Sequence, residues 1–185
     1  MRIIAGTFKG KKITAHANLP VRPTTDFAKE SLFNILNNDY NFDEITVLDL
    51  FAGIGSITLE FASRGSQKIV AVDQDFGCIK FLTETIEKMN LTERVTVIRE
   101  DVYHFLKQNR GNAFEVVYAD PPYFFEQKDY EEIIHLIREN KWLKPDGELI
   151  IEHPANISFS ENPQLIQSRK YGKVCFSFFE FSVED

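Results

Sequence analysis

The residues best suited to chemistry form the run Asp120-Pro121-Pro122-Tyr123, which follows an apolar stretch, residues 116–119, typical of a buried strand. A carboxylate beside a rigid backbone carbonyl can accept both N–H groups of an amine attached to an aromatic ring. Such a nitrogen is a weak nucleophile because its lone pair is delocalised into the ring, so it must be held and oriented. We predict that Asp120 and the Pro121 carbonyl orient the exocyclic amino group of a nucleobase, and that Pro122 stiffens the loop.

Tyr123 begins an aromatic run with Phe124 and Phe125. A base that has left its helix or loop could stack on this face, a contact of about 1 to 3 kcal/mol per base. The amine loses a proton when it is substituted, and Asp120 or water could accept it. We interpret Asp120 as an orienting acceptor first and a general base second. The alternative is a rigid Pro-Pro turn whose aromatic side chains belong to the core.

A second cluster, residues 49–55, lies where the first predicted strand turns into a helix. Gly53 and Gly55 allow a sharp bend and close approach of the backbone to a ligand, at which the following helix directs free N–H groups. Two glycines alone also fit a structural turn. Asp49 adds specificity, because a carboxylate here repels a pyrophosphate and attracts the α-ammonium of a methionine moiety. With Phe51 in the same loop, the pattern favours S-adenosyl-L-methionine over NAD as cofactor.

Acidic residues also follow the next two predicted strands. Asp73 could accept hydrogen bonds from both ribose hydroxyls of the cofactor. Asp101 could accept one from the adenine amino group, with Val102 or Phe76 covering the ring. Each acid taken alone is also explained as a helix cap or a turn residue. Because the carboxyl ends of parallel strands line one crevice, we expect all the acids at these strand ends to face one cleft.

Short β-branched runs alternate with amphipathic stretches from residue 45 onward, which predicts βα units and a parallel sheet covered on both faces. Strands are expected at 45–50, 68–72, 95–99, 116–119 and 148–152, and helices at 56–64, 76–89, 102–109 and 129–140. Residues 165–170 and 174–183 flank a Tyr171-Gly172-Lys173 turn and predict a hairpin that closes the sheet edge antiparallel. The predicted fold class is α/β and Rossmann-like, with helices on both faces.

The N-terminal segment is expected to form a small β-hairpin, with strands at 2–5 and 12–15. Thr24 or Thr25 can cap the helix that follows. One face of that helix is apolar and consists of Ala28, Leu32, Ile35 and Leu36. We expect the 185 residues to form one domain and to act as a monomer, with 1–24 as an extension and 25–185 as a catalytic core.

Charge is distributed unevenly along the chain. The net charge of −7 by itself argues against a nucleic-acid partner, because phosphate binding relies on clustered Lys and Arg. Residues 1–25, however, contain no acid and five basic side chains, Arg2, Lys9, Lys11, Lys12 and Arg22. They form a candidate phosphate-binding surface. The alternative is a solvated hairpin whose lysines guard its edge against aggregation.

Other features exclude several classes of protein. No apolar run approaches the roughly 20 residues that cross a bilayer, and nothing resembles a secretory leader, so we expect a soluble, cytoplasmic protein with no membrane partner. Cys78 and Cys175 lack paired metal-ligand spacing and are expected to be apolar fillers, so no zinc site is predicted. The scattered histidines are expected to be structural or exposed: His16, His104, His135 and His153.

Several motifs together resemble a known family. Residues 49–55 match motif I and residues 120–123 match motif IV of the Rossmann-like class I methyltransferases. More specific motifs occur in order near the N-terminus: Arg2-Ile3-Ile4-Ala5-Gly6, the Gly10-Lys11-Lys12 turn, Arg22-Pro23-Thr24-Thr25-Asp26 and Glu30-Ser31-Leu32-Phe33-Asn34. Together with residues 49–55 and 120–123, these motifs cover nearly the whole chain in the same order, and they resemble the RsmD family of 16S ribosomal RNA guanine-N2 methyltransferases.

The resemblance implies methyl transfer to N2 of one guanine in 16S rRNA, within an assembling small ribosomal subunit. The substrate contacts that it implies are Lys9, Lys11, Lys12, Arg22 and Thr24, in addition to the stacking face predicted at Tyr123. The chain departs from the family at Lys11 and Lys12, where arginine is more frequent, and at Asp73, where glutamate is common. Lysine lacks the bidentate phosphate geometry of arginine, which weakens binding to naked RNA. An assembled ribonucleoprotein suits this chain better, because protein contacts can supplement the phosphate contacts there.

Three other functions remain open. An adenine-N6 methyltransferase would use the same Asp120–Tyr123 chemistry, although enzymes of restriction type usually need a separate recognition region for which this chain has no room. A nicotinamide-dependent oxidoreductase would explain the glycines and Asp73, but neither Asp49 nor the run at 120–123. A non-catalytic RNA-binding domain would bind RNA without methyl transfer.

Overall fold

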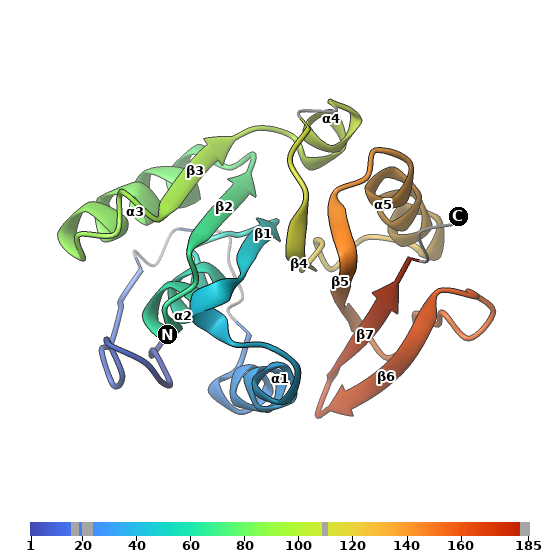
Figure 1. Ribbon diagram of the computed structural model, residues 1–185, viewed down its shortest axis with the longest axis horizontal. Coiled ribbons are helices and arrows are strands. Elements are labelled where there is room, and N and C mark those ends of the chain that lie inside the picture. The colour runs from blue at the N-terminus through green and yellow to red at the C-terminus, as the bar shows by residue number, and fades with distance from the viewer. Residues whose placement is uncertain (16–18, 20–23, 109–110, 182–185) are drawn as a thin grey trace.

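Seven strands form one sheet in the order β3-β2-β1-β4-β5-β7-β6 (Figure 1). The computed structural model describes residues 1–15, 19, 24–108 and 111–181. The strands are β1 (Thr46–Leu50), β2 (Lys68–Asp73), β3 (Val95–Arg99), β4 (Phe114–Ala119), β5 (Leu143–Pro154), β6 (Leu165–Tyr171) and β7 (Val174–Glu180). β1 to β5 run parallel, and the β6–β7 hairpin completes the edge antiparallel. The predicted fold class, with its antiparallel C-terminal hairpin, is confirmed.

Helices cover both faces of the sheet, as the alternating pattern predicts. They are α1 (Asp26–Asp39), α2 (Ser56–Arg64), α3 (Phe76–Lys88), α4 (Val102–Lys107) and α5 (Gln127–Glu139), with a short 3₁₀ helix at Phe42–Glu44. α1, α2 and α3 lie on one face and α4 and α5 on the other (Figure 1), so the strands contribute to two apolar cores. Within the described ranges, no helix is long and apolar enough to cross a bilayer.

The helices bury the faces that their apolar spacing indicates. On α5 the buried residues at positions i, i+3, i+4 and i+7 are Tyr130, Ile133, Ile134 and Ile137. α1, α3 and α4 each begin at a side-chain cap, formed by Thr25, Asp75 and Asp101 respectively. Each cap accepts a backbone N–H of the first turn, which would otherwise lack a partner.

α1 buries more than its predicted apolar face. Of the four predicted residues only Ile35 stays partly exposed, while Lys29 and Phe33 are buried in addition. The Lys29 ammonium donates to the carbonyl oxygen of Arg2 at 2.7 Å and lies 3.6 Å from the Glu60 carboxylate of α2. Burial lowers the pKa of Lys29, and the Glu60 charge opposes that shift. Helical periodicity did not predict this buried lysine, because its partners come from two other segments.

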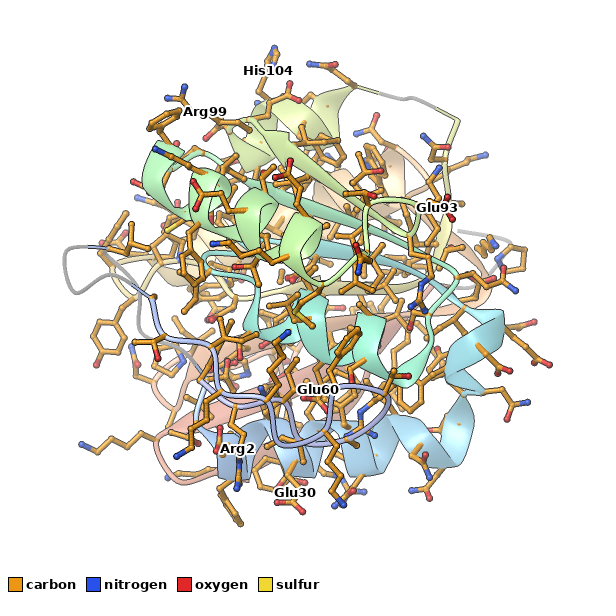
Figure 2. All side chains as sticks on the ribbon, turned by 90° about the vertical axis from the view of Figure 1, so that its left-hand side faces the viewer. Arg2, Glu30, Glu60, Glu93, Arg99 and His104 are labelled. Atoms are coloured by element: carbon orange, nitrogen blue, oxygen red, sulfur yellow. The ribbon has the colours of Figure 1, made fainter. Side chains whose placement is uncertain are left out.

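The N-terminal segment departs from the predicted hairpin. Within residues 1–15 a single bridge joins Arg2 and Lys12, and no paired strands form at 2–5 and 12–15. The backbone N–H groups of Ile4 and Ala5 donate to the Glu60 carboxylate at 2.8 and 3.0 Å instead of to a neighbouring strand. The segment is therefore held against α2 by Glu60 and also closes on itself, because the N–H groups of Ile3 and Ile13 donate to the carbonyl oxygens of Lys11 and Met1 at 3.0 Å. Figure 2 shows it crossing α2 near Glu60.

Glu148 in β5 is a buried carboxylate whose Oε2 atom has no hydrogen-bond partner in the part of the chain that the structure describes. Burial, followed by the charges of Asp39 and Glu180, raises the pKa of Glu148 from 4.5 to about 8. Because the folded-state pKa is the higher one, the stability that protonated Glu148 contributes is complete below about pH 4.5. It is lost as the pH rises through about 8.

We expect Glu148→Gln to melt at a higher temperature than the unsubstituted chain at pH 9, and to differ little from it at pH 5, because glutamine never ionises. Thermal unfolding followed by circular dichroism at both pH values measures this. Glu93→Gln, at an exposed position, is the matched control and should melt like the unsubstituted chain at both. Equal melting temperatures of all three proteins at pH 9 would contradict the raised pKa.

Candidate active site

The predicted acids gather at the carboxyl edge of the sheet. Asp73 ends β2, which pairs with β1, and Asp120 follows β4, which pairs with β1 on the other side. The Asp120 N–H donates to the carbonyl oxygen of Leu50, the last residue of β1, at 3.3 Å. Figure 2 shows Arg99 at this edge, at the end of β3, and Glu93 at the opposite edge. The strand order thus brings the glycine-containing loop and the 120–123 loop together.

Asp49 is 1% exposed and lies near the end of β1. One of its oxygens accepts the backbone N–H of Thr58 at 3.0 Å and also the Thr58 hydroxyl. Burial raises the pKa of Asp49 to about 7, although the Thr58 hydrogen bonds oppose that shift. No cationic side chain of the described residues forms an ion pair with it. A buried carboxylate without a cationic partner among these residues fits a ligand bearing an ammonium group, but contact between the two stays a prediction.

The loop after β1 requires unusual backbone conformations. Gly53 and Gly55 have φ values of 52° and 80°, which glycine adopts without strain, and Phe51 has a φ of 59°. The Gly53 N–H donates to one oxygen of Asp73 at 2.8 Å, and the Asp75 N–H donates to the other at 2.8 Å. Asp73 therefore holds the glycine loop in place. The ribose hydroxyls would have to donate to the same two Asp73 oxygens that accept these backbone N–H groups, and that contact stays a prediction.

Beyond Asp73, the edge offers an exposed aromatic ring. Phe76 is 61% exposed, and the Arg99 guanidinium lies 5.3 Å from its ring centroid. Val102 is only 2% exposed, so Phe76 offers much more surface for an adenine ring than Val102 does. Asp101 is exposed and caps α4 by accepting the His104 N–H at 2.9 Å. Its predicted contact with the adenine amino group is not tested by this arrangement.

The 120–123 loop combines a rigid base with exposed aromatics. Pro121 is buried, and the N–H of Phe125 donates to the Pro122 carbonyl at 2.9 Å, which closes a turn. Tyr123 and Phe124 are 78% and 80% exposed. Phe125 instead packs edge-on against Phe51 and Tyr130 and stacks on Tyr103. The core interpretation of the aromatic run thus holds for Phe125 and fails for the other two rings.

A buried hydrogen-bond cluster behind this loop was not predicted. The Glu152 carboxylate of β5 accepts the Tyr118 hydroxyl at 2.6 Å and the Thr24 hydroxyl at 2.8 Å. Tyr118 precedes Asp120 by two residues, so Thr24 is tied to the strand that carries the candidate catalytic loop. The signal in the sequence is an acid that directly follows the apolar run Leu149–Ile151, in a segment predicted only as a strand. The partners could not be found without the strand order.

The predicted RNA contacts at the N-terminus are divided between the two edges. The turn that carries Lys9 and Lys11 packs on Ser63, near the end of α2 at the amino edge, through bonds from the N–H groups of Thr7 and Phe8. Both lysines are exposed but far along α2 from the glycine loop. Lys12 is bridged to Arg2, nearer the carboxyl edge, where Thr24 also lies. Arg22 and His16 lie outside the described residues.

Metal and thiol chemistry find no site in the described ranges. No group of three or more His, Cys, Asp or Glu side chains is arranged there to hold a metal ion. Cys78 is buried, Cys175 is half-buried, and neither forms a disulfide. His153 is buried, with its Nε2 2.7 Å from the Ser177 hydroxyl oxygen, and burial lowers its pKa. We assign these groups structural roles.

A sheet of this order, with five parallel strands, an antiparallel β7 beside β5 and a glycine loop after β1, is the Rossmann-like fold of the class I methyltransferases. The model of the family described as conserved hypothetical protein 95 matches residues 1–180. The chain belongs to this family, which is the RsmD family.

Similar proteins cover nearly the whole chain. YlbH of Bacillus subtilis is 35% identical over 173 residues, which are 92% of this chain and 92% of that protein. The Haemophilus influenzae protein named ribosomal RNA small subunit methyltransferase D is 33% identical over 97% of this chain and 93% of its own length. The solved structure of yhhF from Escherichia coli superimposes with a TM-score of 0.83 at 28% identity, covering 97% of this chain and 96% of that one.

The pKa of Asp49 gives a test of its predicted pairing with an ammonium group. If the ligand binds only the ionised carboxylate, the affinity for S-adenosylhomocysteine should rise about tenfold from pH 6 to pH 8, as the carboxylate ionises through about pH 7. Isothermal titration calorimetry at both pH values measures this. Asp49→Asn is the matched variant and should bind with the same affinity at both. An affinity of the unsubstituted chain that does not change with pH would limit Asp49 to holding Thr58.

Proposed function

We propose that this chain is an S-adenosyl-L-methionine-dependent methyltransferase that modifies the exocyclic N2 amino group of a guanine in 16S rRNA of the small ribosomal subunit. One observation carries the proposal: a rigid loop at the carboxyl edge sets a carboxylate beside two aromatic rings that are 78% and 80% exposed. Aromatic rings left in solvent next to a polar anchor suit a planar base bearing an amino group. This function would take place in the cytoplasm.

The cofactor half of the site fits S-adenosyl-L-methionine by the chemistry of its groups. Asp49 offers a buried carboxylate to an ammonium, Asp73 a carboxylate to ribose hydroxyls, and Phe76 an exposed ring to adenine. When bound, the cofactor would supply a methyl group made electrophilic by a sulfonium. An acid at Asp49 suits a positively charged ligand and repels the pyrophosphate of NAD, which disfavours the oxidoreductase alternative.

The chain's own groups would orient the nucleophile. Asp120 and the Pro121 carbonyl accept the two N–H groups of the amine, so that its lone pair turns away from the ring and toward the cofactor side of the cleft. The bond between the Asp120 N–H and Leu50 keeps this loop in register with the glycine loop. Tyr123 stacks on the base, and the proton released from nitrogen passes to Asp120 or to water.

The choice of guanine N2 over adenine N6 rests on family membership. The relatives named ribosomal RNA small subunit methyltransferase D support rRNA of the small subunit as substrate. We propose an assembling subunit as the physical substrate, because the chain's net charge of −7 disfavours tight binding to naked RNA. The decisive experiment incubates the protein with radiolabelled cofactor and small subunits that lack the modification, and then maps the labelled base. Label on an adenine, on large-subunit RNA or on DNA would replace this assignment.

For Asp120 we expect Asp120→Ala to lower kcat by roughly 100-fold or more, because the amine loses an oriented acceptor, while affinity for S-adenosylhomocysteine stays near that of the unsubstituted chain. Asp120→Asn keeps an acceptor oxygen without a charge and should retain part of the activity. The assay is single-turnover methyl transfer with calorimetric cofactor binding. Equal losses in the two variants would assign Asp120 to proton removal, and near-normal turnover of the alanine variant would refute both roles.

For Tyr123 we expect Tyr123→Ala to lower methyl transfer by roughly 5- to 150-fold, the equivalent of about 1 to 3 kcal/mol of stacking. Tyr123→Phe should preserve it, because the phenylalanine ring keeps the stacking face. The Tyr123 side chain is 78% exposed, so neither substitution should alter the melting temperature by more than a few degrees. Methyl transfer to small subunits and thermal unfolding measure these effects. A Tyr123→Phe variant as inactive as Tyr123→Ala would show that the hydroxyl, not the ring, is required.

A further inference from the structure

The end of β6 and the turn between β6 and β7 carry a basic patch that the proposed site does not use. Residues 165–179 contain Arg169, Lys170 and Lys173 and no acidic residue, in a chain of net charge −7. All three side chains are exposed. Neither lysine forms an ion pair with a carboxylate of the described residues. We call these three residues the basic turn.

The strand register puts the basic turn at the catalytic edge. β7 runs antiparallel to β5, and Val174, the first residue of β7, pairs with Pro154, the last residue of β5. Glu152, which binds the hydroxyl of Tyr118, is two residues earlier in β5. At about 3.3 Å per residue, the turn begins about 7 Å beyond Glu152 along the strand. In Figure 2 the pale red hairpin reaches the side of the molecule on which Arg99 marks the carboxyl edge.

An exposed aromatic side chain lies beside the basic turn. Phe27, in the first turn of α1, is 65% exposed, and its ring meets Tyr171 edge-on with centroids 6.2 Å apart. Thr24, three residues before Phe27, donates to Glu152. Thr24 is buried and ties the start of α1 to the strands that carry the catalytic loop. Phe27 and Tyr171 therefore lie beside Arg169, which shares the strand face of Tyr171, and next to the turn that holds Lys173. Basic and aromatic side chains that alternate on one surface suit a nucleic-acid strand.

We propose that the basic turn, together with Phe27, binds the phosphate backbone of the RNA that flanks the target base. The inference rests on the proposed function, and it assigns the RNA-facing surface to the C-terminal hairpin as well as to the N-terminal segment. Lys9 and Lys11 sit toward the amino edge, whereas the basic turn projects from the edge that holds Asp120. Protection of an edge strand would account for Lys170 in β6, but not for Lys173, which lies in the turn outside both strands.

The test compares two charge-reversed pairs. Lys170→Glu with Lys173→Glu changes the basic turn, and Lys68→Glu with Lys88→Glu makes the same change in net charge with two exposed lysines at the start of β2 and the end of α3. Methyl transfer to unmodified small subunits is measured as kcat and KM at several salt concentrations, with the melting-temperature rise by S-adenosylhomocysteine as a check on the fold and the cofactor site.

We expect the basic-turn pair to raise KM for the subunit on the order of tenfold at low salt, with kcat and the cofactor-induced melting shift unchanged. The slope of log KM against log salt should fall by about 1.4 to 1.8, as for two lost phosphate contacts. The control pair should behave like the unsubstituted chain. Equal effects in both pairs would indicate general repulsion and overturn the inference, as would a normal KM in the basic-turn pair. If the unsubstituted chain transfers no methyl group to rRNA, the proposed function fails, and this inference fails with it.

Discussion

Glu60 brings four hydrogen-bond and ion-pair partners to one buried carboxylate. It accepts the N–H groups of Ile4 and Ala5, pairs with the Lys29 ammonium at 3.6 Å and receives the Arg64 guanidinium at 3.0 Å. A buried carboxylate is tolerable only when such donors surround it, and removing one partner of a buried pair typically costs about 3 to 5 kcal/mol. The N-terminal segment, α1 and α2 are therefore positioned by one charge.

The same cluster reaches the cofactor side of the molecule. Lys29 also contacts the Ser56 hydroxyl at 3.3 Å, and Ser56 is the first residue of α2, directly after the glycine loop. Just before the start of α1, the Thr24 hydroxyl donates to Glu152, which also accepts the Tyr118 hydroxyl. α1 is thus tied at one face to the cofactor loop and at its start to the strands that carry the catalytic loop. A shift of α1 would disturb both halves of the proposed site.

The carboxyl edge of the sheet holds several residues in energetically unfavourable environments or conformations. Asp49 is buried, forms no ion pair with the residues that the structure describes and has a pKa raised to about 7. Phe51 adopts a positive φ, and three aromatic rings are largely in solvent: Phe76, Tyr123 and Phe124. Each of these conditions carries a free-energy cost in the folded protein. A cationic cofactor and a planar base would relieve them. Local strain and exposure at one edge are thus consistent with a ligand site there.

The sequence by itself determined the alternation of strands and helices, the antiparallel C-terminal hairpin and the acids at the strand ends, because period, glycine placement and side-chain charge are local properties. It also identified the 120–123 loop. Only the tertiary structure decided which lysine is buried, which of the three adjacent aromatics enters the core, and why the N-terminal hairpin has one bridge. Those outcomes depend on partners in other elements, such as Glu60 for Ile4, Glu152 for Thr24 and Phe51 for Phe125, and no local pattern encodes such partners.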